Sequence, residues 1–140
     1  MKRRRRTEIL IQDNGHLAKK FAETITESYE CREITAPQYG MTMIKMRETA
    51  KNSLFYMGEV LVTEAKVEIA NRIGIGIVTG MEEELAKHLA IIDAAYKADL
   101  PETFLWEPQL IAAEDEIRKA KTRRQAELIG TKVNFETMEI

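Results

Sequence analysis

The sequence predicts an α+β fold, in which an antiparallel β-sheet packs against helices. The predicted helices include an N-terminal helical hairpin and a long C-terminal helix. Two observations carry this prediction. The segments with strand-like alternation are joined by connections too short for the crossovers that parallel strands need, and segments with helical spacing stand before and after them. With 140 residues, the chain suits a single domain over residues 1–140.

The first predicted element is the helical hairpin. Apolar residues recur at helical spacing between Leu10 and Ile25, and Asn14-Gly15 is a turn signal that divides this stretch into two short helices. A basic run, Lys2-Arg3-Arg4-Arg5-Arg6, precedes the hairpin. We interpret residues 1–6 as a solvated basic first turn or a frayed end, that is, a basic arm that need not be ordered. The alternative is an arm that binds polyphosphate or nucleic acid through Arg3–Arg6.

Strands are predicted after Tyr29. Cys31 to Ala36 is expected to be a short edge strand or extended linker that ends at Pro37, because proline pushes its predecessor into an extended conformation. From Gly40 to Val78 the chain alternates as strands do, most clearly between Leu61 and Ile69.

A second pair of strands is expected to meet at a turn formed by Ala70-Asn71-Arg72. In the strand after this turn, Ile73, Ile75 and Ile77 share one face, and Gly74 and Gly76 leave the opposite face nearly bare. Glycine weakens a strand, so two glycines at alternate positions indicate the close approach of another backbone, a helix or a partner.

Two helices are predicted after the sheet. Glu82-Glu83-Glu84 opens the first, since acidic residues in a first turn complement the helix dipole. Residues 100–107 are expected to form a loop, and Pro108 to open the last helix, which runs to about Gly130. Residues 131–140 are then expected to form a partner-binding extension.

Composition and charge argue against several classes of function. A formal net charge of -2 is unlike that of a dedicated nucleic-acid binder, which needs a basic excess. The single cysteine permits no internal disulfide, and His16 and His88 do not have the spacing of a zinc site. We therefore predict no metal site and no cofactor bound by this chain. No apolar stretch approaches the roughly 20 residues of a membrane span, so the expected location is cytoplasmic.

No catalytic residue is predicted. The stretch from Gly74 to Gly80 carries three glycines, as phosphate-binding loops do, but their spacing differs from that of a dinucleotide-binding loop. The glutamates that follow would repel a phosphate at the helix N-terminus. No nucleophile stands in a motif that would activate it.

The C-terminal segment is the strongest candidate for a functional site. Arginine beside apolar side chains is typical of interface anchors, and large apolar residues follow among polar neighbours. We predict that this segment binds a partner through Arg123, Arg124, Gln125, Glu127, Thr131, Lys132, Asn134, Phe135, Thr137 and Met138. The alternative is an independent small enzyme, or a binding module for a phosphorylated ligand, in which Arg123, Arg124 and Lys132 bind the anion.

Three blocks of the sequence, residues 55–67, 74–94 and 124–138, resemble the PhnG family, a small subunit of the bacterial carbon–phosphorus lyase system. The resemblance covers residues 3–139 and is densest in these three blocks. The family motif positions outside the C-terminal segment are Gly58, Glu59, Thr63, Gly74, Gly76, Gly80 and Asp93. The chain departs from the family pattern between Met81 and Lys87, where a basic residue and an Ala-Glu pair are expected.

The resemblance implies a non-catalytic subunit that acts with the PhnH, PhnI and PhnJ subunits in organophosphonate catabolism. In that system an alkylphosphonate displaces adenine from ATP to give a ribose 1-phosphonate 5-triphosphate. ATP is therefore implied for the complex and not for this chain. The resemblance places nucleosidase activity on PhnI and the radical cleavage of the carbon–phosphorus bond on PhnJ. A homo-oligomer of the isolated chain is a further expectation.

Overall fold

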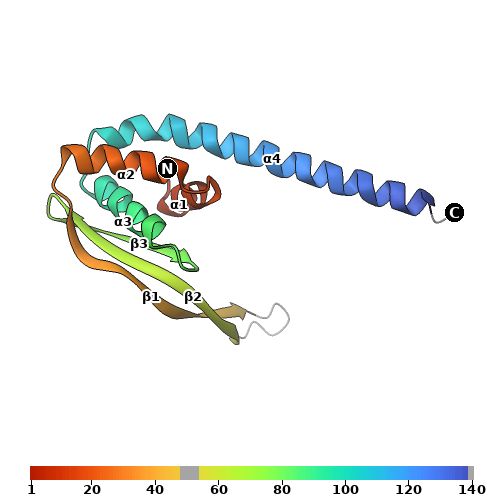
Figure 1. The fold of residues 1–140 in the computed structure, drawn as a ribbon, viewed down its shortest axis with the longest axis horizontal. Coiled ribbons are helices and arrows are strands. Elements are labelled where there is room, and N and C mark those ends of the chain that lie inside the picture. The colour runs from red at the N-terminus through yellow and green to blue at the C-terminus, as the bar shows by residue number, and fades with distance from the viewer. Residues whose placement is uncertain (48–53, 139–140) are drawn as a thin grey trace.

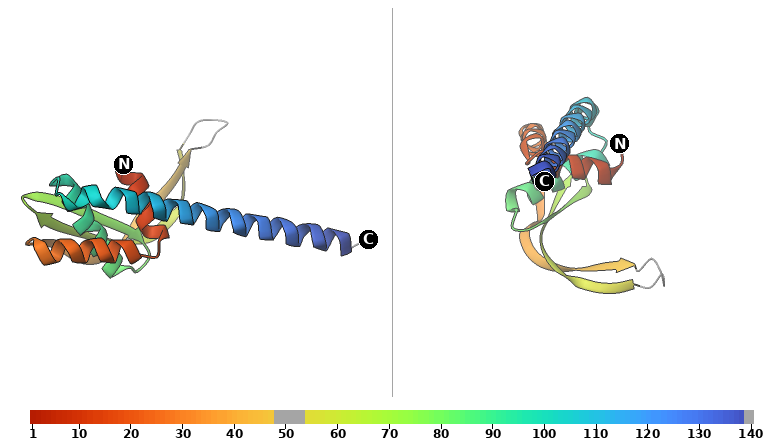
Figure 2. Two further views of the ribbon diagram at one scale, coloured as in Figure 1. Left: turned by 90° about the horizontal axis from the view of Figure 1, so that it is seen from above. Right: turned by 90° about the vertical axis from the view of Figure 1, so that its right-hand side faces the viewer.

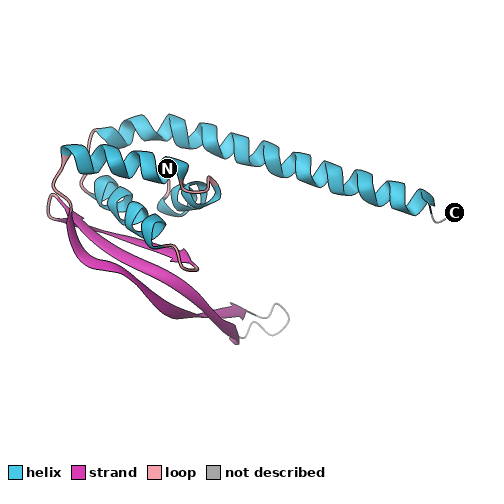
Figure 3. Cartoon of the chain, viewed as in Figure 1, coloured by secondary structure: helices cyan, strands magenta, loops and turns pink. Residues whose placement is uncertain are grey.

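The computed structural model describes the backbone of residues 1–47 and 54–138, and the side chains of residues 1–43 and 58–129. The elements that it describes are, in order, α1 (Arg3–Gln12), α2 (His16–Ser28), β1 (Arg32–Arg47), β2 (Leu54–Ile69), β3 (Arg72–Thr79), α3 (Glu83–Lys97) and α4 (Glu102–Met138). The helices lie together on one side of a three-stranded sheet (Figure 1; Figure 3). The predicted α+β class, the N-terminal helical hairpin and the long C-terminal helix are confirmed.

The sheet is antiparallel, with the strand order β1-β2-β3. Ala70 and Asn71 both have positive φ angles (50° and 64°), which a tight two-residue hairpin turn requires, so the predicted turn is confirmed. β3 pairs with β2 only between Val62 and Ile69. The first part of β2 therefore pairs with β1 alone, and the two strands continue as a ribbon beyond β3 (Figure 2).

β1 is longer than predicted. It is an edge strand, as expected, but it continues through Pro37 as far as Arg47. Its pairing with β2 shifts between Glu33 and Thr35, and again between Thr35 and Gln38. Proline has no N–H to donate, and an irregular stretch of an edge strand is a place where no ladder bond is lost. The prediction that the strand ends at Pro37 is therefore wrong.

The glycine face of β3 lies against α3. A Cβ atom on Gly74 would overlap the backbone of Ala90 and Ala94, and one on Gly76 would overlap the backbone of Ala86 and Ala90. Because alanine recurs every four residues on this face of α3, the helix backbone rests directly on the strand. The predicted close approach is confirmed, and the approaching element is a helix of the same chain. The isoleucines of β3 face the other way, and the side chain of Ile77 is 51% exposed.

α4 begins earlier and ends later than predicted. It starts at Glu102 and contains Pro108 in its interior, so the expected loop over residues 100–107 is wrong. Trp106 and Leu110 are both buried on either side of this proline. Their packing outweighs the helical hydrogen bond that proline cannot make. The helix also continues past Gly130 to Met138, so residues 131–138 extend the same helix, and residues 139–140 lie outside the described part of the chain.

The core joins α2, α3 and α4 through three aromatic rings. Phe21 stacks on Trp106 with 4.6 Å between ring centroids, and Tyr96 tilts against Trp106 at 5.7 Å. Aliphatic side chains from the sheet and the helices surround these rings, including Ile25, Val67, Ile69, Leu89, Ile92 and Leu110. Among the described helices, none combines the length and the apolar composition needed to cross a bilayer.

Candidate functional site

The N-terminal basic run is part of the folded body. Arg3, Arg5 and Arg6 lie in α1, and Arg5 donates two hydrogen bonds to Glu114 of α4, with lengths of 2.8 Å and 2.6 Å. This bidentate contact holds the pKa of Glu114 below its usual value. The interpretation of residues 1–6 as a frayed or disordered arm is therefore wrong. The other interpretation, a solvated first turn, agrees with the exposed side chains of Arg3, Arg4 and Arg5 but not with the buried side chain of Arg6. Acidic side chains from α3 and α4 hold Arg3, Arg5 and Arg6 in place.

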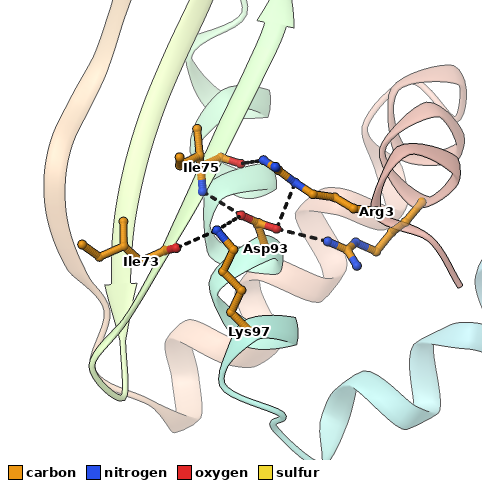
Figure 4. Close-up of polar contacts among 6 residues, drawn as sticks. Arg3, Ile73, Ile75, Asp93 and Lys97 are labelled. Atoms are coloured by element: carbon orange, nitrogen blue, oxygen red, sulfur yellow. Dashed lines mark hydrogen bonds and ion pairs between the residues drawn. The ribbon is translucent and has the colours of Figure 1, made fainter.

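Asp93 is the centre of this ionic cluster (Figure 4). Its side chain is 5% exposed. One carboxylate oxygen lies 3.2 Å from nitrogens of both Arg3 and Arg6, and the other lies 3.1 Å from Lys97 Nζ. The backbone N–H of Ile75 donates to the second oxygen over 2.9 Å. A buried carboxylate needs such partners because burial removes its hydration. Asp93 thus ties α1 and β3 to α3.

Arg6 is buried between Asp93 and an aromatic ring. Its guanidinium carbon lies 3.9 Å from the centroid of the Tyr96 ring, within the range of a cation–π contact. Burial lowers the pKa of Arg6 and raises the pKa of Tyr96. The geometry makes Arg6 a structural residue. Arg4, by contrast, is 92% exposed and pairs only with Glu8 of its own helix among the described contacts.

The same cluster covers the open edge of β3. Ile75 donates to Asp93 and accepts from Arg3 over 3.2 Å, and the Ile73 carbonyl accepts from Lys97 over 3.0 Å. An edge strand with free backbone groups can pair with another chain, and charged side chains on the edge prevent this. The family motif residue Asp93 is therefore explained by folding and edge protection.

Thr63 and Gly80 determine where α3 begins. The Thr63 hydroxyl is fully buried, donates to the Gly80 carbonyl over 2.6 Å and accepts from the Glu82 N–H over 3.1 Å. Gly80 has a φ of 89°, a conformation that favours glycine. These contacts connect β2 to the turn before α3.

The other two motif residues lie on β2 near the start of the ribbon. Gly58 has a φ of 154° and stands next to a shift in the pairing with β1. Glu59 pairs with Met43 in the ladder and is exposed.

A pocket of about 440 Å³ between α2, α3 and the end of β3 has both histidines in its lining. His16, Lys19, Glu84 and His88 contribute to its lining, and burial lowers the pKa of His88. The sequence did not predict this shared pocket, because the two residues lie on different helices. Within the described residues, no three His, Cys, Asp or Glu side chains gather closely enough to hold a metal ion.

The second half of α4 projects away from the body (Figure 1; Figure 2). The side chains of residues 121–129 are all exposed, and Leu128 is 67% exposed. In the first half of α4, the core-facing positions are those of Trp106, Leu110, Ala113 and Ile117. With 3.6 residues per turn, the same face continues through positions 124, 131, 135 and 138. This face of the helix thus extends beyond the body that covers its first half.

The predicted partner-binding residues are divided by this geometry. Arg124, Thr131, Phe135 and Met138 occupy positions on the core-facing side of α4, with Glu127 and Lys132 at its flanks. The remaining predicted residues occupy other faces of the helix: Arg123, Gln125, Asn134 and Thr137. The side chains from residue 130 onward lie outside the described part of the structure, so the helix backbone alone places them.

The ribbon formed by β1 and β2 is a second exposed region that the sequence did not predict as a binding surface. Met41 and Met43 are 59% and 57% exposed on β1. Their signal in the sequence is the methionine-rich stretch from Met41 to Met46, because flexible methionine side chains are common at adaptable interfaces. Two-stranded ribbons are marginal in water, so packing against another molecule would stabilise this one.

A comparison with protein families identifies a family that covers nearly the whole chain. The model of the family described as "Phosphonate metabolism protein PhnG" matches residues 1–139. The match therefore includes the basic N-terminus, the Asp93 cluster and nearly all of the projecting helix.

Proposed function

The chain belongs to the PhnG family of phosphonate metabolism proteins, and from that premise we propose that it is a non-catalytic subunit of the carbon–phosphorus lyase complex. In this role it binds and organises the PhnI, PhnH and PhnJ subunits. It thereby supports the conversion of ATP and an alkylphosphonate to adenine and a ribose 1-phosphonate 5-triphosphate. The catalytic groups for that reaction are supplied by the other subunits.

The continued face of α4 is the observation that carries this proposal. The helix buries one stripe against its own body over its first half, and the same stripe is exposed at Arg124 and Leu128 in the projecting half. A partner subunit that covers positions 124, 131, 135 and 138 takes the place that the body occupies at Trp106 and Leu110. Arginine, phenylalanine and methionine on one face fit the composition of an interface core.

The test is a chain that ends after Gly130, compared with the full chain for binding to a PhnI-like subunit from the same genome. The thermal midpoint should stay nearly the same, because the side chains of residues 121–129, which precede the cut, are already exposed. Capture of the PhnI-like subunit should fall sharply, since removal of a single interface anchor can reduce affinity about thirtyfold. Normal capture by the shortened chain would disprove this site.

Substitutions within the helix refine this test. Phe135→Ala and Met138→Ala should each weaken binding, whereas Thr137→Ala, at a position on a different face, should not. A loss that is equal for all three variants would contradict the assignment to one face. That result would not bear on whether the chain belongs to the complex, because capture of the PhnI-like subunit by the full chain tests that proposal separately.

The rival function, an anion site formed by Arg123, Arg124 and Lys132, has less support. Arg123 and Arg124 are exposed on a projecting helix and occupy different faces of it, so they do not converge on one ligand. Incubation of the purified chain with ATP and methylphosphonate separates the two functions. We expect no free adenine without the other subunits, and substantial release would favour the independent enzyme.

A further inference from the structure

The outer face of α4, opposite the core, is apolar over its first half. Phe104 is 74% exposed, Leu105 is 70% exposed and Ile111 is 47% exposed. Pro108 lies on the same side and cannot donate a hydrogen bond to the Phe104 carbonyl. Ile129, in the projecting half, is 64% exposed. Since 25 residues are about seven helical turns, Phe104 and Ile129 lie on the same face of the helix.

The charges of α4 are segregated along the helix. Residues 102–117 contain five acidic residues and no basic one: Glu102, Glu107, Glu114, Asp115 and Glu116. Residues 118–124 contain five basic residues and no acidic one: Arg118, Lys119, Lys121, Arg123 and Arg124. Two such helices side by side in the same direction would repel each other. Placed antiparallel, the charges that lie on the outer face would meet, because Asp115 of one copy would lie against Arg118 and Lys119 of the other.

We propose that two copies of this chain pair through the outer faces of their α4 helices, antiparallel and about a twofold axis. The occupant of the exposed apolar face is therefore a second α4. This pairing is independent of the proposed partner-binding face, because it uses the opposite side of the same helix. A dimer can thus present two partner-binding faces at once.

The register follows from the positions of the apolar and charged residues. When Phe104 of one copy lies opposite Ile129 of the other, Asp115 lies opposite Arg118. Both are exposed, with 52% and 70% of their side chains accessible. The twofold axis repeats each contact, so the dimer contains two apolar ends and two central ion pairs. The residues of α4 that pack against its own body, Trp106, Leu110 and Ile117, lie on the opposite side of the helix from these contacts.

The experiment is sedimentation equilibrium of the full chain and of charge-reversal variants. The wild type should dimerise. Asp115→Lys places two basic side chains opposite each other at this contact and Arg118→Glu places two acidic ones there, so each variant alone should have a dimer dissociation constant at least about tenfold higher. An equimolar mixture of the two should recover the dimer, because the unlike charges then face each other. Ile129→Asp should also weaken dimerisation.

Arg124→Glu is the matched control, because it reverses a charge on the opposite side of the helix and should leave dimerisation unchanged. Thermal unfolding of every variant shows that the body is still folded. A wild type that stays monomeric up to about 100 μM would overturn the proposal. A mixture that stays monomeric would overturn the antiparallel register. If Arg124→Glu still dimerises but no longer captures the PhnI-like subunit, the result would support separate faces of α4 for the dimer and for the partner.

Discussion

The two basic clusters of this chain have opposite structural roles although they look alike in the sequence. In α1, Arg3, Arg5 and Arg6 bind acidic side chains of α3 and α4, and Arg6 is buried. In α4, Arg123 and Arg124 project into solvent. The difference comes from the partners. The carboxylates that hold Arg6 and Arg5 are 87 and 109 residues away in the sequence, and only the fold brings them near.

A run of like charges therefore does not by itself show whether its side chains are buried in the fold or exposed, because this depends on where the acidic partners lie. The run at the N-terminus has the higher local charge, and it has an internal structural function. Among the side chains that the structure describes, the run in α4 pairs only within its own helix, as Arg118 does with Glu114 and Lys119 with Asp115. Exposed pairs of this kind contribute little to stability. The side chains of the second cluster are therefore available to another molecule.

The largest expected effect is that of Asp93→Ala. This change leaves Arg6 buried without its counterion, and removal of one partner of a buried ion pair typically costs about 3–5 kcal/mol. Glu116→Ala, at an exposed position of α4 between the core-facing and outer faces, is the matched control and should change the free energy of unfolding by less than about 0.5 kcal/mol. Urea unfolding of both variants measures this. Similar values for the two would show that the N-terminal cluster is not structural.

The next effect compares two leucines of one helix. Leu110 is fully buried and Leu128 is 67% exposed, and both lie toward the core-facing side of α4. Leu110→Ala should cost about 2–5 kcal/mol through the cavity that it leaves. Leu128→Ala should have an effect within about 0.5 kcal/mol in the isolated chain. If Leu128→Ala destabilises the chain strongly, the projecting half of α4 is covered even without a partner.

Features that depend on neighbouring residues could be predicted from the sequence, whereas features that depend on contacts between distant segments could not. Elements that depend on local pattern were predicted: the α1–α2 break at Asn14-Gly15, the turn at Ala70-Asn71, the acidic start of α3 and the closely approached glycines of β3. Pro37 and Pro108 misled the prediction because each was treated as the boundary of an element. In both cases the tertiary context allows the proline inside a longer element, at an irregular edge or beside a buried tryptophan.

The candidate functional residues could likewise be predicted only where they lie in one continuous segment. The partner-binding role of Arg124, Phe135 and Met138 stays a prediction, but the helix now explains why these three positions belong together. The Asp93 cluster and the shared pocket of His16 and His88 needed contacts between separate elements. A sequence read one segment at a time contains no signal for such contacts.

The third prediction compares two glycines of the sheet. A side chain on Gly76 would collide with the α3 backbone, whereas nothing lies within 4 Å of the corresponding position on Gly40. Gly76→Val should therefore cost at least about 1–3 kcal/mol through overpacking. Gly40→Val should be nearly neutral, because valine favours strands. Thermal midpoints measure both, and an unchanged midpoint for Gly76→Val would show that α3 does not rest on β3.

The smallest expected change in stability concerns the Arg5–Glu114 contact between α1 and α4, and its dependence on pH tests that contact. The hydrogen bonds from Arg5 are the main cause of the lowered pKa of Glu114 in the folded chain. A carboxyl group with a lowered folded pKa stabilises the protein above its unfolded pKa, near 4.3 for glutamate, and this contribution disappears as the pH falls through the folded value. Glu114→Gln should thus be less stable than the wild type at pH 6–7, and the difference should shrink below about pH 4.3.

The control for this pH effect is the same substitution in a chain that also carries Arg5→Gln. There Glu114→Gln should have little effect on stability at neutral pH, because the bidentate contact is already absent. If Glu114→Gln destabilises both backgrounds equally, Glu114 acts through Arg118 or through packing instead. The N-terminal cluster would then rest on Asp93 alone, and the anchored half of α4 would be held to α1 without an ion pair.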